Sequence, residues 1–116
     1  MLTLYGIPNC GTVKKARRWL DDHGVAYRFH DFRKDGVDER QLRRWVGELG
    51  WETVLNRKGT TWRAAPEVLK AQIDAESAIA YLLEQPSAIK RPVLDLGGQR
   101  LVGFDEMQYL SALGGG

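Results

Sequence analysis

The chain has 116 residues, of which 43% are hydrophobic, with 17 Lys and Arg side chains against 15 Asp and Glu, one cysteine and two histidines. This length and composition are typical of one small globular domain, and a formal net charge of +2 is too small to indicate a nucleic-acid-binding protein. Because Cys10 is alone, an intramolecular disulfide and a zinc site built from several thiolates are excluded. With only His23 and His30 to add, we expect no metal site.

The N-terminal residues have neither a basic region nor an apolar stretch of signal length, and the longest apolar run is 78–83. We therefore expect a cytoplasmic protein without a membrane segment, in which Cys10 is reduced at rest. Nothing in the sequence requires a dimer, and we expect a monomer that does not bind nucleic acid directly.

The first third of the chain predicts a βαβ unit. Residues 2–5 form a short apolar run before Gly6, as in a buried strand that enters a turn. Three apolar residues recur at helical spacing before Gly24, namely Val13, Ala16 and Leu20. The segment 25–32 is rich in aromatic and β-branched residues and predicts a second strand. A helix between two strands permits their parallel pairing.

The middle of the chain, about 38–86, predicts a helical insertion. Asp38 with Gln41 resembles a capping box, and four apolar residues follow at helical spacing, namely Leu42, Trp45, Val46 and Leu49. A second helix-prone stretch begins at Pro66 and ends before Pro86.

The last third predicts a β-hairpin and a final helix. Residues 91–96 and 99–102 are extended runs joined by Gly97 and Gly98, and glycine adopts the positive φ that tight hairpin turns need. Asp105 is positioned to cap a helix with three apolar residues, namely Met107, Leu110 and Leu113.

The order βαβ, helices, ββα is the layout of an α/β, thioredoxin-like fold with a mixed four-stranded sheet and a helical insertion. The same order fits other α/β sandwiches, so periodicity alone leaves the topology open. We expect a single domain over residues 1–113 and a disordered glycine tail at 114–116.

Cys10 lies between the first predicted strand and the first helix. Unpaired backbone N–H groups and the positive end of the helix dipole point toward its sulfur, and Lys14 and Lys15 add positive charge. Each effect favours the thiolate, which is the nucleophilic form. The alternative is that a lone cysteine is a small buried hydrophobic residue, and position alone does not decide between the two.

The absence of a second cysteine narrows the chemistry. Position 13 is valine, so there is no C-x-x-C pair, and an oxidised Cys10 must be resolved by glutathione or by the thiol of another protein. His23 is at the far end of the helix that Cys10 begins, nearly 20 Å away at about 1.5 Å per residue, so it is not a catalytic base for this thiol. His30 lies in the second predicted strand and is more typical of a structural residue.

Two arginines are candidate anion ligands. Arg57 stands in the polar stretch 56–59, and Arg91 precedes Pro92 at the start of a strand. Either arginine could simply be exposed. Most X-Pro bonds are trans, but the mouth of a strand is a natural place for a cis bond, which would fix the Arg91 backbone for contact with an extended ligand.

Three stretches occur in order along the chain: Leu-Tyr-Gly-Ile-Pro-Asn-Cys-Gly-Thr-Val-Lys-Lys-Ala at 4–16, Leu-Asn-Arg-Lys-Gly at 55–59, and Ile-Lys-Arg-Pro-Val at 89–93. Together they resemble the ArsC family of glutaredoxin-type arsenate reductases and their Spx and YffB relatives, with the first stretch most similar to the YffB branch. The resemblance implies a thioredoxin-like fold with a helical insertion and a cis peptide at Pro92. It also implies that Cys10 is the redox nucleophile and that Arg57 and Arg91 bind an anion beside it.

The sequence also departs from the resemblance. Arsenate reductases carry a pattern like Arg-Leu-Cys-Arg-Pro after the hairpin, and this chain keeps Arg100 but has Gly103 at the second arginine. They also have a histidine shortly before the cysteine, where this chain has Gly6. Both differences weaken an arsenate site, and the lack of a C-x-x-C pair removes the redox switch that is usual in Spx regulators.

We therefore predict thiol transfer with glutathione, in which Cys10 is the nucleophile and the substrate-binding residues are Thr12, Lys14, Arg57, Arg91 and Pro92. The arginines and Lys14 would hold glutathione carboxylates, and the backbone beside Pro92 would pair with the tripeptide. Glutathione is then a co-substrate, no cofactor is bound, and proteins with thiols or disulfides are further partners. The alternatives are an Spx-like adaptor or transcriptional regulator that docks on a partner such as RNA polymerase, and an arsenate reductase.

Overall fold

The computed structural model describes residues 2–114. They form two compact units, of which the first contains the described residues up to Asp35 and from Arg91 onward, and the second contains Gly36–Lys90. The chain leaves the first unit after Asp35 and returns to it at Arg91.

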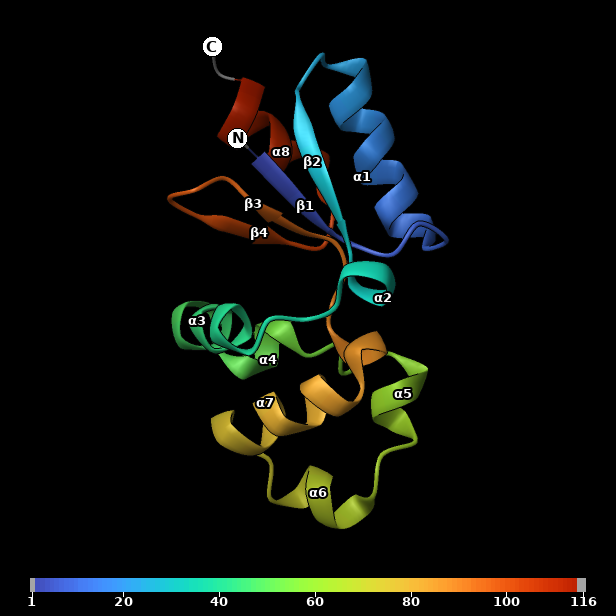
Figure 1. The fold of residues 1–116 in the computed structure, drawn as a ribbon, viewed down its shortest axis with the longest axis vertical. Coiled ribbons are helices and arrows are strands. Elements are labelled where there is room, and N and C mark those ends of the chain that lie inside the picture. The colour runs from blue at the N-terminus through green and yellow to red at the C-terminus, as the bar shows by residue number, and fades with distance from the viewer. Residues whose placement is uncertain (1, 115–116) are drawn as a thin grey trace. The chain divides into compact units, whose positions relative to one another are not determined.

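The first unit contains a mixed four-stranded sheet with the order β2-β1-β3-β4 (Figure 1). Its strands are β1 (Leu2–Gly6), β2 (Tyr27–Asp31), β3 (Val93–Asp95) and β4 (Arg100–Val102). β1 pairs in parallel with β2 and antiparallel with β3, and β3 pairs antiparallel with β4. The mixed sheet predicted from the sequence is confirmed, because the βαβ segment supplies the parallel pair and the hairpin supplies the antiparallel one.

Helix α1 (Gly11–Asp22) connects β1 to β2 and buries the predicted stripe, to which the structure adds Trp19. Of this face, Ala16, Trp19 and Leu20 pack in one cluster with Leu4 of β1, Leu94 of β3 and Tyr109. Burying each large apolar side chain contributes roughly 1.5–3 kcal/mol. The packing therefore anchors α1, and with it Cys10 at its start.

The second strand is shorter than the sequence predicted. It ends at Asp31, because Phe32 begins the short helix α2 (Phe32–Asp35). The Asp31 carboxylate accepts the backbone N–H groups of Arg33 at 2.9 Å and Lys34 at 3.4 Å. A capping carboxylate offers the backbone an alternative to the strand ladder, so the chain turns into a helix at this point.

The C-terminal helix also differs from the prediction. Asp105 caps α8 (Glu106–Tyr109) as expected, but α8 passes directly into the π-helical turn η2 (Leu110–Gly114). Met107 is 73% exposed, whereas Tyr109 is fully buried. The ring of Tyr109 packs edge-on against Trp19 and Phe104, with centroids 5.5 and 4.9 Å away, whereas Met107 lies on the exposed side of α8. The tail predicted to be disordered begins within η2 at Gly114, and 115–116 lie outside the described residues.

The second unit is helical from Glu39 to Ala88. Its elements are α3 (Glu39–Leu49), α4 (Trp51–Val54), α5 (Thr60–Arg63), α6 (Glu67–Ala71), α7 (Ala75–Glu84) and the 3-10 turn η1 (Pro86–Ala88). Asp38 caps α3 as the sequence predicted, and Asp74 forms a capping box with Ser77 at the start of α7.

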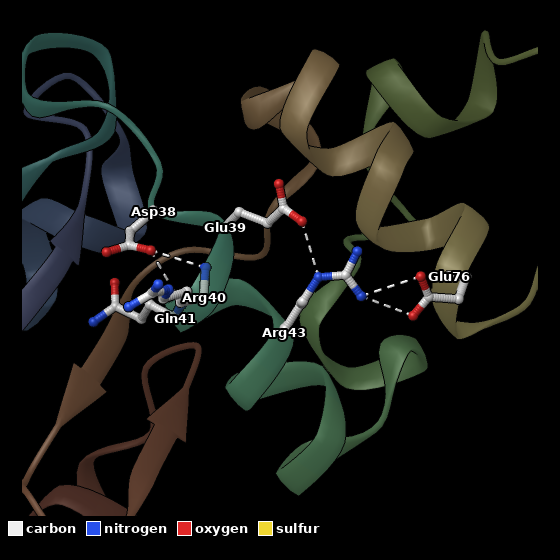
Figure 2. Close-up of polar contacts among 6 residues, drawn as sticks. All are labelled: Asp38, Glu39, Arg40, Gln41, Arg43 and Glu76. Carbon is white, nitrogen blue, oxygen red and sulfur yellow. Dashed lines mark hydrogen bonds and ion pairs between the residues drawn. The ribbon is translucent and has the colours of Figure 1, made fainter.

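Arg43 links two helices of this unit. Its Nε donates to Glu39 Oε2 at 2.9 Å, and its Nη1 donates to both carboxylate oxygens of Glu76 at 3.1 and 2.8 Å (Figure 2). Glu39 is on α3 with Arg43, and Glu76 is on α7. Because the three side chains are exposed, the pairs fix how these helices meet more than they stabilise the fold.

Candidate active site

Cys10 is the N-cap residue of α1 and has an extended backbone, with φ −102° and ψ 128°. Its carbonyl accepts the backbone N–H of Lys14 at 2.9 Å, which is the first hydrogen bond of the helix. The side chain is a free thiol of intermediate exposure. The sulfur is therefore both accessible and located where the helix has its unpaired N–H groups.

Gly6 brings the end of β1 against the first turn of α1. A Cβ atom at this position would lie 2.7 Å from Cγ2 of Val13, which is fully buried. Carbon atoms do not approach so closely without displacement. A histidine at position 6, as in arsenate reductases, is thus incompatible with this packing of Val13.

The pKa of the Cys10 thiol is lowered by a balance of opposing effects. Burial alone raises it, but interactions with the backbone N–H of Val13, the side chain of Arg91 and the backbone N–H of Thr12 lower it, as does the positive charge of Arg91. In the structure the Cys10 side chain makes no capping hydrogen bond to the helix. The N–H groups therefore act mainly on the thiolate, whose negative charge they stabilise.

Arg91 reaches Cys10 because of its place before β3. The Arg91–Pro92 peptide bond is cis, as predicted. Val93, the next residue, pairs with Tyr5 near the end of β1, the strand that leads to Cys10. Pro92 is buried, and its carbonyl accepts the backbone N–H of Gly103 at 2.8 Å. The segment before β3 is thus held from both neighbouring strands.

The predicted residues of the first helical turn have different roles. Thr12 is next to the thiolate through its backbone N–H. Lys14 and Lys15 are exposed, and within residues 2–114 the groups that lower the Cys10 pKa do not include them. Water screens an exposed ammonium, so their charge does not add to the effect as the sequence suggested. The helix start predicts N–H groups near the sulfur in general, and the N-cap position of Cys10 singles out Val13 as the third residue of α1.

Arg57 belongs to the second unit. It is exposed, its guanidinium carbon lies 5.9 Å from the centroid of the Trp51 ring, and it lines a pocket of about 240 Å³ with Lys58 and Lys90 among others. The lining also includes the carboxylate of Glu52, so three cationic side chains and one anionic side chain surround this pocket. The role predicted for Arg57, binding an anionic substrate beside Cys10, stays a prediction.

The arginine kept from the arsenate reductase pattern is engaged elsewhere. Arg100 Nε lies 3.7 Å from Oδ2 of Asp95, and the two side chains are only 10% and 19% exposed. Gly103, in place of the second arginine, has a φ of 81°. This backbone conformation suits glycine and strains an arginine. The second arginine of the Arg-Leu-Cys-Arg-Pro pattern is thus replaced by a glycine whose backbone conformation does not suit an arginine.

No group of three His, Cys, Asp or Glu side chains within residues 2–114 is arranged to hold a metal ion. In the same part of the chain, no helix has both the length and the hydrophobicity needed to cross a membrane.

The family profile described as ArsC family matches residues 5–112. The chain belongs to the ArsC family. A solved structure of a YffB protein is 57% identical and superimposes with a TM-score of 0.94, covering 97% of this chain and 99% of the other. An arsenate reductase (ArsC) related protein from Brucella melitensis is 50% identical with a TM-score of 0.79, covering 95% and 92%. With these neighbours the fold is α/β and thioredoxin-like, as predicted.

Two curated relatives extend the comparison. An uncharacterized protein from Haemophilus influenzae is 43% identical over 97% of this chain and 98% of its own length. The global transcriptional regulator Spx of Streptococcus agalactiae is 27% identical over 91% of this chain and 78% of its own length. The ArsC-family chain therefore has relatives of both the reductase-like and the regulator type.

Proposed function

We propose that this protein is a glutathione-dependent thiol transferase that uses Cys10 as its nucleophile. The observation that carries the proposal is the position of the thiol, at the N-cap of α1 beside Arg91, with a lowered pKa. A lowered pKa increases the fraction of the thiol that is present as the nucleophilic thiolate. Since Cys10 is the only cysteine of the sequence, turnover requires a thiol from outside the chain.

The proposed reaction consists of two thiol–disulfide exchanges. In the first, the Cys10 thiolate attacks the glutathione sulfur of a protein–glutathione disulfide, a Cys10–glutathione disulfide forms, and the protein leaves as a thiolate. In the second, a glutathione thiolate attacks that sulfur, oxidised glutathione leaves, and the Cys10 thiolate is restored. The net reaction consumes one glutathione thiolate: together with the protein–glutathione disulfide it gives the protein thiolate and one molecule of oxidised glutathione, and Cys10 is unchanged.

The residues of the first unit also support binding of glutathione. Arg91 offers a guanidinium, which forms paired hydrogen bonds with a carboxylate. Lys14, in the first turn of α1, offers a second cation. The backbone next to Pro92 is extended toward β3 and suits main-chain pairing with a tripeptide.

Intact-mass spectrometry after incubation with oxidised glutathione tests the proposal. We expect one glutathione per chain in the wild type, none in Cys10→Ser, and release of the adduct when reduced glutathione is added. If an alkylating reagent labels Cys10 but glutathione does not, the proposal is wrong.

Arsenate reduction is supported less well than thiol transfer as the main activity. Gly103 stands where arsenate reductases have the second arginine of the Arg-Leu-Cys-Arg-Pro pattern, and Arg100 is paired with Asp95. A side chain at Gly6 would also meet Val13. Arsenate-dependent oxidation of glutathione in the presence of glutaredoxin, lost in Arg91→Ala, would revive this function.

A second candidate function is a protein-binding adaptor, which the similarity to the Spx regulator of Streptococcus agalactiae favours. Affinity capture with the wild type and Cys10→Ser separates the two candidates. An adaptor retains its partner without the thiol, whereas a thiol transferase loses turnover.

A further inference from the structure

Besides the site around Cys10, the first unit has a pocket of about 580 Å³ beside α1. One wall consists of α1 residues from Thr12 to Asp22, and the other includes Phe104 and Glu106 at the start of α8. From Thr12 to Asp22 the helix rises about 15 Å. The pocket, called here the α1–α8 pocket, thus begins two residues after Cys10 and continues along the helix away from it.

The aromatic part of the lining is held in place by the core. Trp19 is 8% exposed and Phe104 is partly exposed, and both rings pack edge-on against the buried ring of Tyr109. Ligand pockets are usually preformed, apolar surfaces with a few polar groups. The two rings supply such a surface.

The charged part of the lining has both signs. Lys15 lies on the half of the α1 wall nearer to Cys10, Arg18 lies just past its middle, Asp22 lies at its far end, and Glu106 lies on the α8 side. None of these four side chains has a hydrogen bond or ion pair to another described residue, in contrast to Arg43 in the second unit.

This arrangement restricts the occupant. A purely anionic ligand would meet Asp22 and Glu106, and a purely apolar ligand would leave four charged groups desolvated without partners. A peptide segment has an apolar body and can carry both charges, so it complements both parts of the lining. At about 3.3 Å per residue, an extended segment of four or five residues spans the length of the pocket.

We propose that the α1–α8 pocket binds an extended segment of a protein substrate, with an acidic side chain near the target cysteine at Lys15 and Arg18 and a basic one farther along at Asp22. The proposal rests on the proposed function for the role of Cys10, and it names proteins, not small disulfides, as the substrate class. The pocket would hold the chain that flanks the sulfur under attack.

Binding is measured on the full chain with Cys10→Ser, so that no thiol chemistry is involved. The probe is the capped hexapeptide Ser-Asp-Leu-Gly-Lys-Ala, in which serine replaces the target cysteine. The control peptide has asparagine and glutamine in place of the two charged residues. Backbone amide signals in NMR spectra report the site, because assigned signals distinguish the lining of the pocket from the second unit.

We expect the charged peptide to shift the signals of Lys15, Arg18, Trp19 and Glu106, and to bind at least about threefold more tightly than the neutral peptide. Arg18→Glu in the Cys10→Ser chain should weaken binding about tenfold, because it replaces attraction by repulsion. Arg44→Glu changes the net charge equally at an exposed position of α3 and should leave binding unchanged.

Three results would overturn the inference: equal binding of the two peptides, shifts confined to other residues, or displacement of the peptide by free glutathione with the same shifts. The last result would make the pocket a co-substrate site. Failure of the proposed function is a separate result, since it is the absence of glutathione on wild-type Cys10 by mass spectrometry.

Discussion

Arg91 stabilises the thiolate of Cys10 in two ways, through its side-chain interaction with the sulfur and through its positive charge. The two residues are far apart in the sequence, and the pairing of β3 with β1 brings them together. The reactivity of the thiol therefore depends on the sheet as well as on the helix that Cys10 begins.

Replacement of Arg91 tests this dependence. The rate of alkylation rises with pH through the thiol pKa, so in the wild type its midpoint should lie below that of an unperturbed cysteine thiol. In Arg91→Ala the midpoint should move upward, because both contributions of the guanidinium are lost. The shift should be partial, since the N–H groups of Val13 and Thr12 remain.

Lys14→Ala is the matched control for that measurement. It also removes a cation near Cys10, but Lys14 is exposed and does not lower the thiol pKa. Its midpoint should equal that of the wild type. Equal upward shifts in both variants would mean that general charge, and not contact with Arg91, controls the thiol.

The close approach of Gly6 to Val13 predicts the effect of adding a methyl group. Gly6→Ala should lower the free energy of unfolding by about 1–3 kcal/mol, because its Cβ would lie 2.7 Å from a Val13 methyl group in a filled core. Gly11→Ala should cause no loss, since no atom lies within 4 Å of its Cβ position. Chemical denaturation gives both values.

A double variant identifies the cause. If the clash with Val13 is responsible, Gly6→Ala combined with Val13→Ala should be more stable than the sum of the single effects predicts, because neighbouring substitutions couple. Strict additivity would contradict the steric explanation.

The positive φ of Gly103 predicts a backbone effect in the loop after β4. Gly103→Ala should cost roughly 1–2 kcal/mol of unfolding free energy, because an L-residue is strained in the left-handed region. Gly98→Ala, in the hairpin turn, is the comparison, since Gly98 has neither a positive φ nor an atom near its Cβ position. Thermal or urea unfolding that shows equal losses would refute the prediction.

The cap of α7 predicts acid sensitivity in the second unit. Hydrogen bonds from the backbone and side chain of Ser77 lower the pKa of Asp74 below its ordinary value. A depressed folded-state pKa contributes stability that is complete above the unfolded pKa of about 3.9 and is lost as pH falls through the folded pKa. Part of the acid-induced fall in the urea midpoint should therefore come from Asp74.

Two substitutions separate the charge from the cap. Asp74→Asn keeps an oxygen acceptor but does not titrate, so its urea midpoint should fall less on acidification than that of the wild type. Asp74→Ala loses the cap and should be less stable at neutral pH. An unchanged acid dependence in Asp74→Asn would show that other carboxylates are responsible.

Much of the fold follows from local patterns. The capping of α3 by Asp38 and of α8 by Asp105 and the buried stripe of α1 depend on residues within a few positions of each other. The two differences from the prediction have separate causes: the second strand ends early because Asp31 caps the following residues locally, whereas the burial of Tyr109 depends on packing between distant segments. The ring of Tyr109 packs against Trp19 and Phe104, whereas Met107 is exposed.

For the site, the sequence by itself determined that Cys10 begins a helix and has no second cysteine in the chain, so that the proposed thiol transfer would need an external thiol. Only the tertiary structure decided that Arg91 and not Lys14 lowers the thiol pKa, that Gly6 is packed against Val13, and that Arg100 is paired with Asp95. The physical reason is that a helix start is specified by neighbouring residues. The electrostatics of a thiolate depend instead on which charges are held close to it and away from water.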